Sequence, residues 1–214
     1  MGLSRVDVVA SGVHTGARYS APVTGWWPTD VAWVRDARHL PDSLLQQRRR
    51  RAAHMQLRRL EPDRILFVCH GNICRSPFAA AVFARSCPSE LSERVAALSA
   101  GFVGPGRTPP PQALAAGFRF GIDMSAHRSA LVTEESLKAA DLVVVMSADQ
   151  ARDLRARVKT LSTKVLVLGD LDPSPTNRRT IADPWGGSDS AFEGSYERIE
   201  RCVRELVRLL TADR

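Results

Sequence analysis

Four short runs of consecutive apolar residues occur in the later part of the chain. They are ILFV at 65–68, VAALSA at 95–100, LVVVM at 142–146 and KVLVLG at 164–169. Runs without alternation are typical of strands buried on both faces, as in a parallel sheet. Between and after them lie stretches with helical spacing, at about 76–87, 110–121, 149–158 and 190–211. We predict an α/β fold, a small doubly wound four-stranded parallel sheet with helices on both faces.

The final helix has the clearest pattern. Its apolar residues recur at intervals of three and four, namely Phe192, Tyr196, Ile199, Val203, Leu206 and Leu210. Cys202 lies beside this stripe, and we expect it to be an ordinary core residue, as free cysteines commonly are.

The first 61 residues have a different, irregular and Arg-rich texture. The change comes at Pro62 and Asp63, so we expect an extension over 1–61 and a folded domain over 62–214. The extension contains an aromatic segment, GWWPTDVAWVRD at 25–36, and a candidate basic helix at 43–60. The tryptophans Trp26, Trp27 and Trp33 either pack on the domain or bind a partner, and the sequence does not rank these alternatives.

The excess positive charge is concentrated in the extension. Residues 1–61 hold ten Lys and Arg against five Asp and Glu, whereas residues 62–214 hold 20 against 18. Contact of Arg48–Arg51 with nucleic acid or an anionic membrane is one interpretation of this run. A solvated helix face is the commoner one, and we favour it.

The chain shows no signal for a membrane or for secretion. No run approaches the roughly 18 apolar residues of a membrane-spanning helix, and the N-terminus lacks the sustained apolar stretch of a signal peptide. The four cysteines, Cys69, Cys74, Cys87 and Cys202, form neither a secreted disulfide framework nor paired zinc ligands. We therefore expect reduced thiols and a cytoplasmic location, and the oligomeric state stays open.

The stretch CHGNICRSP, residues 69–77, follows the first predicted strand, where ligands bind in open α/β sheets. Ser76 followed by Pro77 predicts a helix start, with the serine hydroxyl as its cap. The positive end of such a helix binds anions and favours the thiolate form of a nearby cysteine. Cys69 is thus a candidate nucleophile, and Arg75 offers paired donors for phosphoryl oxygens.

The full motif, with its C-x5-R-S spacing, resembles the signature of the low-molecular-weight protein tyrosine phosphatases. The resemblance extends from about residue 64 to 212, through Ser99-Ala100-Gly101, Gly121-Ile122-Asp123, His127, Asp141 and Asp183-Pro184-Trp185. It implies a protein-tyrosine-phosphatase that hydrolyses phosphotyrosine through a phosphocysteine on Cys69, with no metal or cofactor.

The same resemblance implies roles for further residues. It implies substrate binding by Trp185 and by the loop residues His70, Gly71, Asn72, Ile73, Cys74 and Ser76. Ser76 would also hydrogen-bond the thiolate, while Asn72, Ser99 and His127 would hold the loop. Cys74 is either an inert thiol or the partner of Cys69 in a protective disulfide.

The general acid is expected to be Asp183, because the family's acid occupies the matching Asp-Pro. The loop IADPWGGSD that carries it follows the fourth strand. Asp170 and Asp172, in LGDLDPSP, are the rival candidates and are interpreted as turn residues. Either Phe102 or Val103 would form the wall that contacts the substrate ring.

Other activities occur on similar scaffolds. Arsenate reductases relay oxidation to distal cysteines, and this chain has none between Cys87 and Cys202. The protein arginine phosphatase carries Thr where this chain has Ile73, whose apolar side chain favours an aromatic phosphoester. A non-catalytic phosphotyrosine-binding module, or a basic adaptor, is disfavoured by the intact Cys69, Arg75 and Asp183. Bacterial family members often act on autophosphorylated tyrosine kinases, which are the expected partners.

Overall fold

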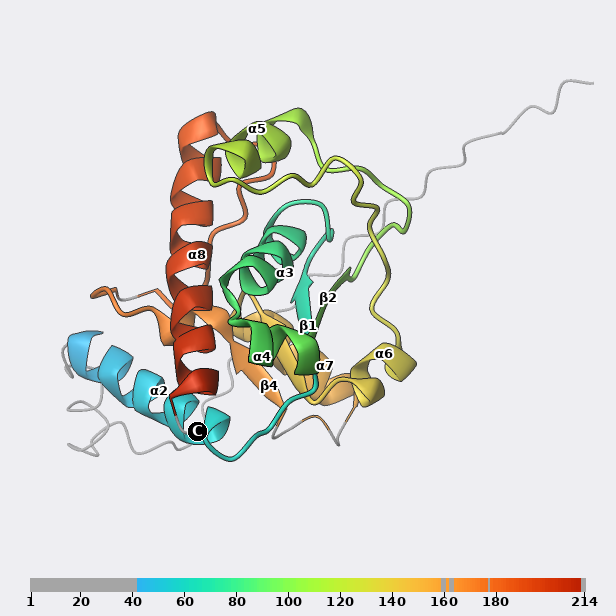
Figure 1. Ribbon diagram of the computed structural model, residues 1–214. Coiled ribbons are helices and arrows are strands. Elements are labelled where there is room, and N and C mark those ends of the chain that lie inside the picture. Colours follow the sequence, from blue (N-terminus) through green and yellow to red (C-terminus); the bar gives the residue numbers. More distant parts are fainter. Residues whose placement is uncertain (1–41, 159–160, 162–163, 177, 213–214) are drawn as a thin grey trace, which may run out of the picture. The chain divides into compact units, whose positions relative to one another are not determined.

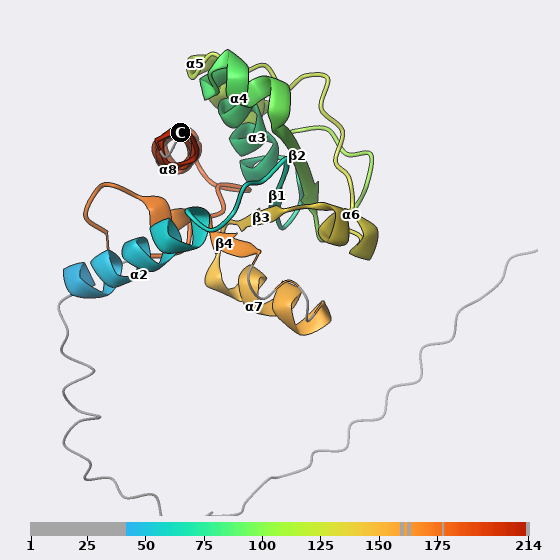
Figure 2. The same ribbon diagram turned by 60° about the horizontal axis from the view of Figure 1, so that its bottom comes forward.

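The computed structural model describes residues 42–158, 161, 164–176 and 178–212. Its sheet has four parallel strands in the order β2-β1-β3-β4 (Figures 1 and 2). The strands are β1 (Arg64–Cys69), β2 (Ala96–Gly101), β3 (Leu142–Val145) and β4 (Val165–Val167). This confirms the predicted α/β class with a parallel sheet.

Successive residues of β1 point to opposite faces of the sheet and enter two separate cores. Ile65 and Phe67 pack with the side chains of α3 (Arg75–Ser86), α5 (Pro111–Arg119) and α8 (Asp189–Thr211). Leu66 and Val68 pack with those of α6 (Glu134–Ala139) and α7 (Ala148–Arg157). Helices therefore cover both faces (Figures 1 and 2), and consecutive apolar residues are what a strand between two cores requires.

Helix α8 buries the whole predicted apolar stripe, and Cys202 is buried beside it. Tyr196, on this stripe, stacks on Phe78 of α3 with ring centroids 3.9 Å apart. Phe120 meets the Phe78 ring edge-on, at 5.6 Å. In the part of the chain that the structure describes, no helix combines the length and apolar character needed to cross a bilayer.

Three short elements were not predicted: α4 (Ser89–Arg94), α6 and η2 (Leu168–Leu171). The start of α6 is a capping box, in which Thr133 and Ser136 each bond the other's backbone amide. The last predicted strand is correspondingly shorter, because the chain turns into η2 after Val167. Gly169 lies so close to the Arg179 carbonyl that a Cβ there would be 2.0 Å from its oxygen.

Helix α2 (Asp42–Leu57) begins one residue before the expected range 43–60 and ends three residues before the end of that range, and it packs on the domain. All described residues, α2 included, belong to one compact unit. The sequence alone predicted the start of the domain at residue 62. Ala53 and Leu57 of α2 are buried in the same core as α3 and α8. Trp26, Trp27 and Trp33, for which two interpretations were open, lie outside the described residues.

The basic run of α2 is divided between two environments. Arg50 pairs with Glu205 at 2.6 Å, and Arg49 lies 3.9 Å from Asp170. Arg48 and Arg51 are exposed. Two of the four arginines therefore form ion pairs that hold α2 against the rest of the domain.

Replacing Phe78 with Ala should lower the free energy of unfolding by about 3–5 kcal/mol, because it empties a fully buried site between two aromatic rings. Phe118→Ala is the matched control, since that ring is 58% exposed and its loss should cost no more than about 0.5 kcal/mol. Urea denaturation of both variants measures the difference. Equal losses for the two variants would contradict this packing.

Candidate active site

A cavity of about 170 Å³ opens at the carboxyl end of β1, where the loop 70–74 leads into α3. It brings together the predicted nucleophile, the arginine and the acid. The residues that line it are Cys69, His70, Gly71, Ile73, Cys74, Arg75, Val103, Arg107, Asp183 and Trp185. Asn72 and Ser76, also expected to bind substrate, are fully buried behind the loop instead.

Four carbonyl groups of the loop accept hydrogen bonds from outside it. The His70 oxygen accepts from the Phe102 amide at 2.8 Å, and the Gly71 oxygen accepts from Arg107 at 2.7 Å. The Asn72 oxygen lies 2.7 Å from the Nε2 atom of His127. The Cys74 oxygen accepts from the Tyr196 hydroxyl at 3.3 Å.

This arrangement determines where the loop's N–H groups point. In a trans peptide the carbonyl and the following N–H lie on opposite sides. The N–H groups of residues 71, 72, 73 and 75 therefore face away from the outer partners and toward the cavity. The backbone N–H of Asn72 points this way and donates to the Sγ atom of Cys69 at 3.2 Å. A ring of inward N–H groups is a binding site for an anion.

The hydroxyl of Ser76 contacts the Cys69 sulfur and does not cap helix α3. Helix α3 starts at Arg75, one residue before the predicted cap, and Cys74 at its N-cap makes no side-chain capping bond. The Ser76 Oγ atom lies 3.0 Å from the Cys69 sulfur and 3.3 Å from the Ala100 carbonyl oxygen. It accepts a bond from the Asn72 side chain at 2.9 Å, and it can donate its single proton either to the Ala100 carbonyl or to the Cys69 sulfur.

Asn72 holds the loop from behind. It has a φ of 51°, in the left-handed region that asparagine tolerates. Besides Ser76, its Nδ2 group donates to the Ser99 hydroxyl at 2.9 Å, and its Oδ1 atom accepts from the Ala130 amide at 2.8 Å. With His127 on its carbonyl, Asn72 connects the loop to β2 and to the segment before α6. The structure thus brings Ser99 and His127 to the loop.

Close approach of β2 to the loop depends on Gly101. A Cβ at this position would lie 2.7 Å from the Asn72 nitrogen and 2.9 Å from the Gly71 carbonyl carbon, which no side chain tolerates. The strand is therefore able to approach the loop only because this residue has no side chain.

Arg75 and Asp183 pair at the mouth of the cavity. The guanidinium is 4% exposed and donates one bond to the Ile181 carbonyl, at 3.2 Å, and another to the Asp183 carboxylate. The Asp183 side chain is 44% exposed, so it is accessible to a substrate. The other Asp183 oxygen accepts from the Trp185 amide at 3.3 Å.

Neither rival acid lies in the cavity. Asp170 is bound by two nitrogens of Arg179, at 2.8 and 2.6 Å. Asp172 is 1% exposed and accepts bonds from Arg198 and Arg201. Burial raises the pKa of Asp172, but the bonds from Arg201, the Ser174 amide and Arg198 outweigh it, so the pKa lies below its usual value. Both carboxylates are structural counterions.

The walls of the cavity include residues that the sequence left open or missed. Val103 lines it, whereas Phe102 packs into the core beneath α6 and α7, with Arg157 over its ring. Trp185 is 68% exposed at the mouth. Arg107 was not predicted, although its position in the loop after β2, at the same edge of the sheet, was an available signal.

Cys74 shares the cavity with Cys69 but differs from it chemically. Burial, together with the charges of Cys69 and Asp183, raises the pKa of Cys74 to about 12. Cys74 therefore remains a thiol at neutral pH, while the Cys69 sulfur accepts a bond from the Asn72 backbone N–H and lies 3.0 Å from the Ser76 hydroxyl. Both sulfurs are free in this structure.

Known proteins resemble this chain in sequence. Residues 64–214 match the sequence model of a family described as low molecular weight phosphotyrosine protein phosphatase. The human protein of that name is 38% identical over 149 residues, which are 67% of this chain and 92% of that protein. A probable low molecular weight protein-tyrosine-phosphatase, EpsP of Ralstonia nicotianae, is 36% identical over 150 residues, 69% of this chain and 96% of that protein.

Solved structures share the fold as well. The YwlE arginine phosphatase from Geobacillus stearothermophilus superposes with a TM-score of 0.62 at 28% identity, covering 71% of this chain and 95% of that one. Helix α2 precedes the residues that match the family.

Iodoacetate at neutral pH should alkylate Cys69 before the other three cysteines. Burial raises the pKa of Cys87 to about 11 and that of Cys202 to about 12, so these thiols, like Cys74, are almost entirely protonated. Mass spectrometry of proteolytic peptides measures the order, and inorganic phosphate should protect Cys69. Earlier labelling of Cys74 would contradict the assignment of the nucleophile.

Proposed function

The chain belongs to the low molecular weight phosphotyrosine protein phosphatase family, and from this premise we propose that Cys69, Arg75 and Asp183 carry out its hydrolysis of phosphotyrosine. The observation that carries the proposal is the convergence of these three side chains on one cavity whose floor is the loop 70–74. The cavity thus combines a nucleophile, an anion site and an acid.

In the first step the Cys69 sulfur attacks phosphorus in line with the bond to the phenolic oxygen. The phosphoryl oxygens bind the inward N–H groups and the Arg75 guanidinium, which stabilise the charge of the transition state. The phosphoryl group thereby binds the Arg75 guanidinium, which in this structure donates to the Asp183 carboxylate. Asp183 gives its proton to the leaving oxygen as the P–O bond breaks, and tyrosine departs.

In the second step water attacks the phosphocysteine. The Asp183 carboxylate takes a proton from this water, and the S–P bond breaks to release inorganic phosphate. The electron pair returns to sulfur as a thiolate, which the Ser76 hydroxyl and the Asn72 amide stabilise. Cys69 and Asp183 are then ready for another cycle.

The cavity walls support an aryl phosphoester as the substrate. Ile73 and Val103 present apolar surface, and Trp185 offers an aromatic ring at the mouth. The superposed YwlE structure is an arginine phosphatase. By the resemblance, that activity goes with Thr at the position of Ile73, whose side chain has no polar group for a guanidinium.

The substrate in the cell is a phosphoprotein, and we assign it more finely to an autophosphorylated tyrosine kinase, as for the bacterial family members that the sequence resembles. Similarity to EpsP supports a bacterial setting. The four free thiols fit a cytoplasmic location, because Cys69 must be reduced to act.

The purified protein should hydrolyse phosphotyrosine peptides at least about 10-fold faster, in kcat/KM, than phosphoarginine or phosphoserine peptides, since apolar walls discriminate by roughly 10- to 200-fold. Phosphate release measures these rates, and arsenate with a thiol donor should give no turnover. Cys69→Ser is the inactive control. A preference for phosphoarginine would contradict the assignment of the substrate.

Asp183→Asn should lower kcat/KM for phenyl phosphate by about 100- to 1000-fold and for p-nitrophenyl phosphate much less, because kcat/KM reports the first step, in which only a poor leaving group needs a proton. Steady-state kinetics on both esters measures the effect. Asp170→Asn is the control, since that carboxylate lies outside the cavity. A loss that is equal for both esters would exclude Asp183 as the acid.

A further inference from the structure

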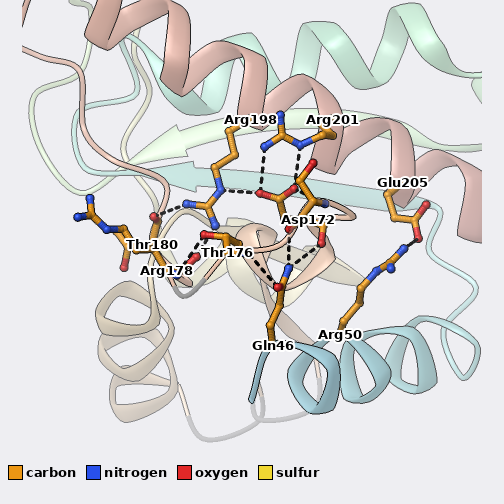
Figure 3. Close-up of polar contacts among 10 residues, drawn as sticks. Gln46, Arg50, Asp172, Thr176, Arg178, Thr180, Arg198, Arg201 and Glu205 are labelled. Carbon is orange, nitrogen blue, oxygen red and sulfur yellow. Dashed lines mark hydrogen bonds and ion pairs between the residues drawn. The ribbon is translucent and has the colours of Figure 1, made fainter. Parts of the chain in front are cut away.

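The side chain of Gln46 in α2 binds three backbone groups of the segment 172–176. This segment leads toward the acid loop, residues 181–189, which carries Asp183. The amide nitrogen of Gln46 donates to the Asp172 carbonyl at 3.2 Å and to the Ser174 carbonyl at 2.7 Å. Its oxygen accepts from the Thr176 amide at 2.8 Å (Figure 3). Gln46 thus supplies partners that this irregular segment lacks within itself.

Gln46 projects from a helix that is firmly attached. Arg50, one turn further along α2, pairs with Glu205 of α8, and Gln56 donates to the Val165 carbonyl at 3.3 Å. Bonds from Arg208 and from Arg50 lower the pKa of Glu205 to about 2, so the pair is charged throughout the physiological range. The position of Gln46 is therefore set by α8 and the sheet.

The same segment is held from its other side by α8. The buried Asp172 carboxylate accepts bonds from Arg198 and Arg201, and Arg198 also donates to the carbonyls of Arg178 and Thr180 (Figure 3). Residues on both sides of position 177 are thus tied to one carboxylate. Arg198 thereby links Asp172 to the chain at Arg178 and Thr180.

From Thr180 the contacts lead directly to the site. The Ile181 amide donates to the Met146 carbonyl at 2.9 Å, and the Ile181 carbonyl accepts from Arg75 at 3.2 Å. Asp183 follows two residues later and meets the same guanidinium. The path from α2 to the acid is therefore an unbroken set of contacts between packed elements.

We propose that Gln46 is a positioning residue for Asp183, and that α2 is a working part of the phosphatase although it precedes the residues that match the family. The proposal rests on the proposed function, because it assumes that Asp183 is the acid. Proton transfer requires the acid to lie within hydrogen-bond reach of the leaving oxygen, so a loosened loop slows the step that needs the proton.

The test compares Gln46→Ala with Gln47→Ala in the full chain, since Gln47 is the exposed neighbour on the same helix. For Gln46→Ala we expect kcat/KM on phenyl phosphate to fall about 5- to 10-fold, well short of the ~100-fold that a 1 Å misplacement can cause. On p-nitrophenyl phosphate kcat/KM should change less than about two-fold, because kcat/KM reports the first step and this leaving group needs no proton there. Gln47→Ala should match the unmodified protein.

The decisive experiment introduces Gln46→Ala into the Asp183→Asn variant and measures the same rates on the double variant. If Gln46 acts through Asp183, its effect should disappear there, because no proton is left to position. An effect that persists, or that is equal for both esters, would overturn the proposal and leave Gln46 a purely structural role. Should Gln46→Ala fail to fold, as judged by circular dichroism, Gln46→Met keeps the aliphatic stem and faces the same two criteria. A failure of the proposed function is seen separately, as an Asp183→Asn single variant that does not distinguish the esters.

Discussion

The site depends on one constraint, which is that the carbonyl groups of the loop 70–74 must be bound on the outside. Each of four oxygens has its own partner, and those partners come from the loop after β2, from the segment before α6 and from α8. Because each peptide is planar, outward carbonyls turn the following N–H groups inward, toward the phosphoryl group. An unbound carbonyl buried there would cost about 1–3 kcal/mol and would favour rotation of its peptide. The anion site is therefore held by the whole domain and not by the loop alone.

The sequence predicted the features that repeat or that concentrate chemistry in a short stretch. Four apolar runs gave the sheet, and the spacing of Phe192, Tyr196 and Ile199 gave α8. Asp183 was chosen over Asp170 and Asp172 by resemblance, and of the three it alone lines the cavity. Arg107 and the Tyr196 hydroxyl were missed, because their role follows from which carbonyls they reach, and local pattern does not encode that. The cap role expected of Ser76 was wrong: a serine before a proline is typical of a cap, but α3 begins one residue earlier, and the hydroxyl makes the contact with the Cys69 sulfur that the resemblance implied.

Helix α2 changes how the domain is delimited. The family match begins at residue 64, yet the compact unit includes α2, which contributes buried residues, ion pairs and Gln46. Its arginines show why a run of charged residues is hard to interpret from sequence. Arg49 and Arg50 form ion pairs with carboxylates of the domain, while Arg48 and Arg51 are exposed to solvent. The buried Asp172 is bound both by Gln46 of this helix and by two arginines of α8. Although it stands in an Asp-Pro pair like that of the expected acid, its role is to hold the segment that leads to the acid loop.

The central claim is that phosphate passes through the Cys69 sulfur. Its most direct test is to denature the enzyme rapidly during turnover of p-nitrophenyl phosphate and to locate any attached phosphoryl group by mass spectrometry. The account predicts one phosphoryl group, on the peptide that carries Cys69 and bonded to its sulfur. A phosphoryl group on His70 or elsewhere, or none at a time when product has formed in a burst, would contradict it.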